Sequence, residues 1–351
     1  LEARTGLDPA LVGDVLLGCV TQHGEQAGNI AKTSALYAGW PASVSGMTVN
    51  RFCSSGSQSI ALMADSIKAG NMNIGIAGGI ESMSMVAMGG NKPIAYPGLM
   101  DTLPNAYAAM GTTAEVVARR YDITREAQDE FAANSHKKAV AALESGKFAD
   151  EIVPLDVRVR ENGGGRDIHF DTDEGPRADT TVEGLARLKP VFDPMGTVTA
   201  GNASQINDGA AALLLASEDA VRRHGLQPLA RVVGTAFAGV PPRIMGYGPV
   251  PATRHLLARL RLGLDDLDVI ELNEAFAAQA LTCTRELGLA DDDPRINPRG
   301  GAIALGHPLG MSGARLAVTA VRQLEQNGGR YALCTMCVGV GQGIATVLER
   351  V

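Results

Sequence analysis

Residues 312–324 read Ser-Gly-Ala-Arg-Leu-Ala-Val-Thr-Ala-Val-Arg-Gln-Leu, and residues 55–67 read Ser-Gly-Ser-Gln-Ser-Ile-Ala-Leu-Met-Ala-Asp-Ser-Ile. In both stretches a Ser-Gly pair is followed by apolar residues 4, 7, 8 and 11 positions after the glycine: Ile60, Met63, Ala64 and Ile67 in one, Ala317, Ala320, Val321 and Leu324 in the other. This spacing places the apolar residues on one face of a helix. We therefore predict two helices, ended by Gly70 and by Asn327-Gly-Gly329.

Each predicted helix is followed by a predicted strand, Asn73–Ala77 after the first and Tyr331–Met336 after the second. Two further buried strands, Asp14–Val20 and Gly46–Phe52, precede the first helix. Alternating strands and helices are typical of layered α/β proteins. The repeated helix–strand unit indicates two related α/β halves of similar topology.

The region between the two units has a looser pattern. Residues 85–205 hold loops rich in Gly, Met and Pro and one long predicted helix, Thr124–Leu143. An apolar strand pattern resumes over Thr197–Leu215. We therefore divide the chain into a first half, an inserted loop domain and a second half: residues 1–84 with 206–217, residues 85–205, and residues 218–351.

Composition excludes several classes of protein. The chain has 351 residues, 45% hydrophobic and 20% charged, with a net charge of −7, which disfavours a nucleic acid or an anionic membrane as partner. No apolar run is long enough to span a membrane. Five cysteines suit free thiols in a reducing compartment, so we expect a cytoplasmic protein. Organellar targeting stays open, because the sequence starts at Leu1 without an initiator methionine.

Cys53 lies between a predicted strand and a predicted helix. The partial positive charge of a helix N-terminus is expected to lower the pKa of this thiol and make it a nucleophile. The alternative is a small buried hydrophobic residue, as most free cysteines are.

His307 is held between Gly306 and Pro308 in a glycine-rich loop. A histidine fixed in this way is suited to be a general base, because its ordinary pKa is near neutral. A surface histidine is the alternative.

Cys334 and Cys337 form a lone C-x-x-C. No second cysteine pair completes a zinc site, and the motif does not lie at a helix start as a redox pair would. Because strand side chains alternate between faces, the two thiols should point to different sides, and only Cys337 is expected to reach a site. The following Gly339–Gly343 lacks the helix that a dinucleotide loop requires.

Asn273 follows the predicted strand Asp268–Leu272 and opens a predicted helix through Gln279. The carboxyl end of a strand is a favoured place for chemistry in α/β folds. Asn273 is thus either a polar anchor of a site or the N-cap of its helix.

Taken together, these motifs resemble the thiolases, the acetyl-CoA acyltransferases. The resemblance runs from about residue 12 to the end, and its motifs are Asn50-Arg-Phe-Cys-Ser-Ser-Gly56, Met110-Gly-Thr-Thr-Ala-Glu115, Thr199-Ala-Gly-Asn-Ala-Ser204, Asn273-Glu-Ala-Phe-Ala277, Gly300-Gly-Ala-Ile-Ala-Leu-Gly-His-Pro308 and Cys337-Val-Gly-Val-Gly-Gln-Gly343. It implies two five-stranded α/β/α halves with an inserted loop domain. The first strand and helix of the family are missing here, and we expect a truncated sequence with an exposed sheet edge.

The resemblance also implies a role for each site residue. Cys53 is the acylated nucleophile, His307 activates it, and Cys337 moves the substrate α-proton. Asn273 holds a water that forms one oxyanion hole with His307, and the backbone amides of Cys53 and Gly343 form the other.

Contacts to coenzyme A are expected at Met110, Gly234 and Arg177, with a solvated arginine as the alternative at Arg177. Gly234 replaces a serine, and Ala109 a histidine, of the biosynthetic members. Coenzyme A and acyl-CoA are expected as substrates, with no permanently bound cofactor and no metal. The family implies a homodimer or a homotetramer.

The leading hypothesis is a degradative thiolase of the β-oxidation type in fatty acid metabolism, which cleaves 3-ketoacyl-CoA with CoA. The ending Met336–Val347 favours it. A biosynthetic acetoacetyl-CoA thiolase and a non-catalytic acyl-CoA-binding member are the alternatives.

Overall fold

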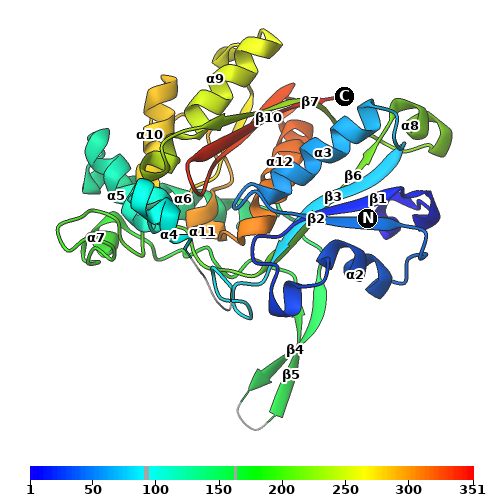
Figure 1. The fold of residues 1–351 in the computed structure, drawn as a ribbon, viewed down its shortest axis with the longest axis horizontal. Helices are drawn as coiled ribbons and strands as arrows, with labels where there is room; N and C mark the ends of the chain where they lie inside the picture. Colours follow the sequence, from blue (N-terminus) through cyan, green and yellow to red (C-terminus); the bar gives the residue numbers. More distant parts are fainter. Residues whose placement is uncertain (91–94, 162–163) are drawn as a thin grey trace.

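The computed structural model of the chain describes residues 1–90, 95–161 and 164–351. Two mixed sheets face each other across a central pair of helices, and further helices cover the outer faces (Figure 1). The α/β fold class is therefore confirmed.

The first sheet has the strand order β2-β1-β3-β6. Strand β1 (Asp14–Gly18) runs parallel to β2 (Ser45–Val49) and to β3 (Ile74–Glu81), and β6 (Gly209–Ala216) is antiparallel to β3. Helix α2 (Ile30–Tyr37) packs on β1 and β2 from the outside. Strands β1 and β3 are almost wholly buried because helices cover both of their faces.

The second sheet has the order β7-β10-β9-β8. Strand β8 (Val269–Leu272) runs parallel to β9 (Tyr331–Val338), and β10 (Gln342–Arg350) lies antiparallel between β9 and β7 (Ala230–Gly239). A lone parallel bridge joins Ile270 to Ile296 on the outer side of β8. Strands β1, β3 and β6 thus correspond to β8, β9 and β10, and the predicted shared topology is confirmed.

The strand number differs from the expected five in each half. Within the described residues each sheet has four strands. In the second sheet the fifth position is reduced to the bridge at Ile296, where Ile270 N donates to the Arg295 carbonyl and Asn297 N donates to the Ile270 carbonyl. In the first sheet β6 is the last strand, and within residues 1–90, 95–161 and 164–351 no strand pairs with its outer edge, where the counterpart of β7 would lie.

Helices α3 (Ser55–Lys68) and α12 (Leu309–Asn327) form the central layer, where Figure 1 shows them side by side between the sheets. The two predicted apolar faces meet in one core cluster, whose helical members are Ile60, Met63, Leu316, Ala317, Ala320 and Leu324. A Cβ atom on Gly56 would lie 2.7 Å from the backbone nitrogen of Ala314, and one on Gly313 would overlap the backbone nitrogen of Ser57. The paired glycines therefore let the two helices touch backbone to backbone.

The inserted region contains α5 (Met110–Arg120), α6 (Arg125–Glu144) and a hairpin of β4 (Leu155–Glu161) and β5 (Gly164–Phe170) that projects from the body (Figure 1). The predicted long helix is α6, and Thr124 caps it by accepting a hydrogen bond from Ala127 N. The remaining helices are α1 (Glu2–Thr5), α4 (Pro97–Thr102), α7 (Val182–Ala186), α8 (Glu218–His224), α9 (Pro249–Leu260), α10 (Ala277–Leu287) and α11 (Ala302–Leu305).

The strand predicted over Thr197–Leu215 exists only from Gly209 onward. The earlier part forms only isolated bridges, Thr199 with Pro190 and Ala203 with Phe276, and a side chain binds its first two amides. The Glu115 carboxylate accepts from Thr197 N at 2.9 Å and from Val198 N at 2.8 Å. Apolar composition alone does not reveal such a partner.

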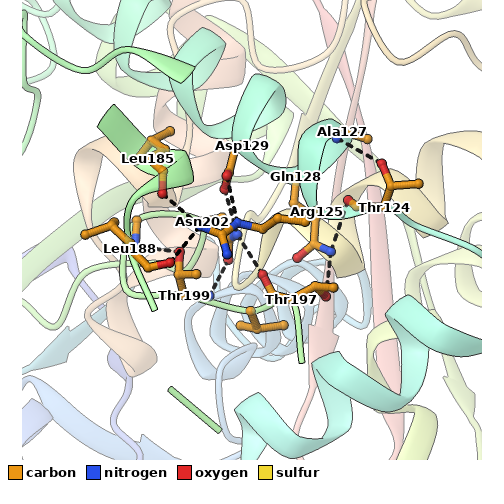
Figure 2. A network of polar contacts seen from close by, with 12 residues as sticks. Thr124, Arg125, Ala127, Gln128, Asp129, Leu185, Leu188, Thr197, Thr199 and Asn202 are labelled. Carbon is orange, nitrogen blue, oxygen red and sulfur yellow. Dashed lines mark hydrogen bonds and ion pairs between the residues drawn. The ribbon is translucent and has the colours of Figure 1, made fainter. Parts of the chain in front are cut away.

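A polar network fixes this irregular segment to the first turn of α6 (Figure 2). Buried Asp129 accepts from Arg125 Nε at 2.7 Å and from Asn202 Nδ2 at 2.9 Å. The Asn202 carbonyl in turn accepts from Ala277 N at 2.9 Å, at the start of α10. The insertion is thus bonded to the segment that follows β8.

Replacement of Gly313 by Ala should destabilise the chain by about 3 kcal/mol, since the new methyl group overlaps backbone that has no room to move. Urea unfolding measures this loss. The control is Gly263→Ala, in an exposed turn where the nearest atom to a new Cβ lies 3.7 Å away. Equal midpoints for the two variants would contradict the close helix contact.

Candidate active site

Cys53 lies in the turn before α3 and is 8% exposed. The preceding Phe52 has a left-handed φ of +46°, and its N–H donates to the Asn50 side chain at 2.8 Å. Burial raises the pKa of the Cys53 thiol to about 11, although hydrogen bonds from the backbone of Cys53 and Gly339 act in the opposite direction. The prediction of a lowered pKa is therefore wrong, because desolvation exceeds the effect of the helix end. A base must take the proton before this thiol can attack.

His307 lies just before α12 and is 4% exposed, so the surface alternative is wrong. Its Nδ1 is 2.5 Å from Ser312 Oγ, and that hydroxyl donates to the Pro308 carbonyl at 3.0 Å. Ser312 therefore accepts from Nδ1–H, which leaves Nε2 unprotonated. Burial, followed by the charge of Arg315, lowers the pKa of His307 to about 4. The imidazole is neutral near pH 7 and can accept a proton at Nε2.

Asn273 follows the last residue of β8 and is fully buried. Its Nδ2 lies 3.4 Å from His307 Nε2, and within the described residues its Oδ1 has no hydrogen-bond partner. The N-cap alternative is wrong, since α10 begins four residues later, after Phe276. A buried acceptor without a partner, beside a neutral imidazole, is suited to bind a water or a substrate group.

Cys337 and Gly343 are paired residues of β9 and β10. Burial raises the pKa of Cys337 well above its ordinary value, and a thiolate at Cys53 would raise it further. Cys334 instead belongs to the central core cluster, so the two thiols do face different sides, as predicted. A Cβ on Gly343 would overlap the carbonyl oxygen of Gly248, which explains a glycine at this position.

An apolar cluster surrounds Cys337 and is called the Cys337 cluster here. Its other buried members are Ala114, Val198, Met245, Ala275 and Phe276. Met110, at the start of α5, packs against it. Gly234 lies in β7 opposite Val347 and faces Leu256 and Leu260 of α9, and Arg177 is exposed. Of the three predicted coenzyme A contacts, only Met110 is brought to the Cys337 cluster, and the roles of all three stay predictions.

Three buried residues of this region were not identified from the sequence: Glu81, Glu274 and Ser312. Glu81 ends β3 and accepts from the amides of Val20, Thr21 and Gly310, so it fixes the start of α12 beside the first sheet. The feature of the sequence that could have revealed Glu81 is a single carboxylate at the end of an apolar strand. The Ser-Gly pair at Ser312 was interpreted only as a helix start.

Glu274 fixes the other side of the His307 loop. It accepts from Ser135 Oγ at 2.6 Å, from Asn297 Nδ2 at 2.7 Å and from Ile303 N at 3.2 Å. These bonds join α6, the loop after α10 and the helix before His307. The segments that hold Asn273 and His307 are therefore joined through Glu274.

The arrangement offers a buried thiol, a neutral imidazole with an unprotonated nitrogen, and a second buried thiol beside an apolar cluster. Such a set can form a thioester and move a proton at carbon. In the described part of the chain, no group of three or more His, Cys, Asp or Glu side chains is placed to hold a metal ion. The same residues contain no helix of the length and apolarity needed to cross a bilayer.

Residues 1–219 match the family model described as "Thiolase, N-terminal domain", and residues 226–350 match "Thiolase, C-terminal domain". A beta-ketoadipyl-CoA thiolase of Pseudomonas aeruginosa is 53% identical over 100% of this chain and 90% of the relative. A 3-ketoacyl-CoA thiolase of Vibrio vulnificus is 47% identical, with 100% and 90% covered. The crystal structure of the Bacillus anthracis acetyl-CoA acetyltransferase is similar with a TM-score of 0.89 and 42% identity, and covers 100% of this chain and 90% of that one.

Replacement of Ser312 by Ala should slow the reaction of Cys53 with iodoacetamide at pH 7 by about 100-fold, because His307 loses the acceptor that keeps its proton on Nδ1. The loss of Cys53 thiol is followed by mass spectrometry. Ser145→Ala, at the exposed end of α6, is the matched control. An unchanged rate in Ser312→Ala would show that Ser312 does not set the His307 tautomer.

Proposed function

This chain belongs to the thiolase family of acyltransferases, and on that premise we propose that it is a degradative thiolase. It would cleave a 3-ketoacyl-CoA with CoA into acetyl-CoA and an acyl-CoA shorter by two carbons. The observation that carries the proposal is that a protonated Cys53 and a neutral His307 with an unprotonated Nε2 are both buried just before helices α3 and α12, whose backbones touch at Gly56 and Gly313. The reaction requires no resident cofactor, because both substrates bring their own coenzyme A.

The first half-reaction begins when His307 Nε2 takes the proton of Cys53. The thiolate attacks the 3-keto carbon, and the developing oxyanion is stabilised by backbone amides of Cys53 and Gly343. The bond between the α and β carbons breaks and leaves an acyl-Cys53 and the enolate of acetyl-CoA. Cys337 gives its proton to the enolate carbon.

The second half-reaction returns every proton. The incoming CoA thiol gives its proton to the Cys337 thiolate, and its sulfur attacks the acyl-Cys53 carbonyl. Cys53 leaves as a thiolate and recovers the proton held by His307. The raised pKa of both cysteines suits this cycle, because each thiol is a proton donor at rest.

The names of the relatives favour one class of substrate. Several bacterial relatives between 50% and 53% identical are named beta-ketoadipyl-CoA thiolase, from Acinetobacter and Pseudomonas species. We propose that this chain likewise cleaves a short 3-ketoacyl-CoA that ends in a carboxylate. With this substrate the proposal becomes the degradation of dicarboxylic acyl-CoA, and it replaces fatty acid β-oxidation, the leading hypothesis from the sequence.

Cleavage rates for 3-oxoadipyl-CoA, acetoacetyl-CoA and a long-chain 3-ketoacyl-CoA test the substrate class. We expect kcat/KM for 3-oxoadipyl-CoA to exceed the other two by about tenfold or more, the discrimination that one well-placed polar contact provides. Release of acetyl-CoA is measured by chromatography. A preference for the long chain would restore the β-oxidation hypothesis, and a sole preference for acetoacetyl-CoA would favour the biosynthetic alternative.

The division of labour between the two cysteines is tested with acetyl-CoA and intact-protein mass spectrometry. Cys337→Ser should still gain an acetyl group on Cys53 but lose turnover by at least about 100-fold, because proton transfer at carbon fails. Cys53→Ser should gain no acetyl group. An unacetylated wild-type protein would favour a non-catalytic acyl-CoA-binding member.

A further inference from the structure

A buried ion pair lies behind the site. Arg315 Nη1 is 2.9 Å from Glu271 Oε2, and the Glu271 side chain is 0% exposed. Gln323 Nε2 donates to the other carboxylate oxygen at 2.7 Å. Both oxygens of Glu271 are thus bonded to α12.

The pair joins the two elements that carry Asn273 and His307. Glu271 stands two residues before Asn273 on β8. Arg315 stands on α12, three residues after Ser312, which bonds the His307 ring. A shift of β8 along α12 would therefore change the 3.4 Å separation of Asn273 Nδ2 and His307 Nε2.

Glu271 bonds only one of the two terminal guanidinium nitrogens of Arg315. Its second guanidinium nitrogen, Nη2, is buried and has no hydrogen-bond partner in the described part of the chain. The charge of Arg315 lowers the pKa of His307, second only to burial. A fixed cation near a buried imidazole opposes its protonation.

The surroundings of Glu271 bring its pKa close to neutral pH, so its charge depends on pH. Burial raises the pKa of Glu271 to about 7, while Arg315 and the Gln323 hydrogen bond act against that rise. The carboxylates of Glu151 and Glu274 raise the pKa further, and Lys138 of α6 and the Cys334 thiol of β9 also interact with Glu271. Arg315 therefore stays charged throughout the neutral pH range, whereas Glu271, which binds it, is only partly ionised there.

We propose that Arg315 and Glu271 are positioning residues for the thiolase reaction. Glu271 holds Arg315 and so fixes α12 against the strand that Asn273 follows, and the fixed charge of Arg315 adds to the effect of burial in opposing protonation of His307. Neither residue touches the substrate. The inference rests on the proposed role of His307 as the base for Cys53.

The test is the pKa of His307, read by NMR from its ring in histidine-labelled protein, with the resonance assigned by its loss in His307→Asn. Arg315→Met should raise this pKa by roughly one unit, since a like charge is removed. Arg315→Lys keeps the charge and should restore a value near that of the wild type. The acid limb of kcat/KM should move to higher pH in Arg315→Met only, because protonated His307 cannot act as a base.

The variant Glu271→Gln tests the opposite change in charge. Loss of the carboxylate leaves the Arg315 charge unopposed, so the pKa of His307 should stay the same or fall. A purely structural pair would instead give the same upward shift in Arg315→Met and Glu271→Gln. That result, or no rise in Arg315→Met, would overturn the proposal.

Two safeguards keep the outcome interpretable. If Arg315→Met does not fold because Glu271 is left buried and unpaired, the double variant Arg315→Met/Glu271→Gln removes both charges, and its His307 pKa should lie above that of Glu271→Gln. The NMR titration requires no turnover. A wild-type protein without thiolase activity would therefore refute the proposed function, while the His307 titration would still decide the inference.

Discussion

The backbone contact between α3 and α12 is the constraint on which the site depends. Cys53 precedes one helix and His307 the other, and each helix has a glycine, Gly56 or Gly313, where the partner backbone approaches. Any side chain at these two positions would separate the helix ends and with them the thiol and the imidazole. Each half thus contributes one of the two groups from equivalent places, so the pseudo-repeat also serves the proposed reaction.

The second sheet positions the other residues of the candidate site. Strand β8 ends at Asn273, and β9 and β10 bring Cys337 and Gly343 into adjacent positions. The insertion then closes the arrangement, because Glu274 bonds α6 and Asn202 bonds the start of α10. Elements far apart in the sequence thus meet at one buried place, where low polarity controls the protonation of each group.

Local periodicity explains which parts were predictable. Helices α3 and α12 and strands β3 and β9 follow from apolar spacing, and the glycine-framed positions of Cys53, His307 and Cys337 follow from the motifs. The irregular Thr197–Asp208 segment was missed because the Glu115 carboxylate, remote in sequence, replaces its strand partner. The predicted direction of the shift in the Cys53 pKa was wrong for a similar reason. A helix end is visible in the sequence, whereas the depth of burial is decided by the whole fold.

Burial of Cys53 as a neutral thiol has a consequence for how long the protein remains intact. Peroxides and other oxidants react with thiolates, and both Cys53 and Cys337 hold their protons firmly at rest. In the proposed reaction, Cys53 becomes vulnerable only in the brief interval when His307 has removed its proton, and the bound substrate then occupies the surrounding space. The Cys53 sulfur is therefore expected to react mainly when substrate is bound, and in the resting protein it is an unreactive thiol.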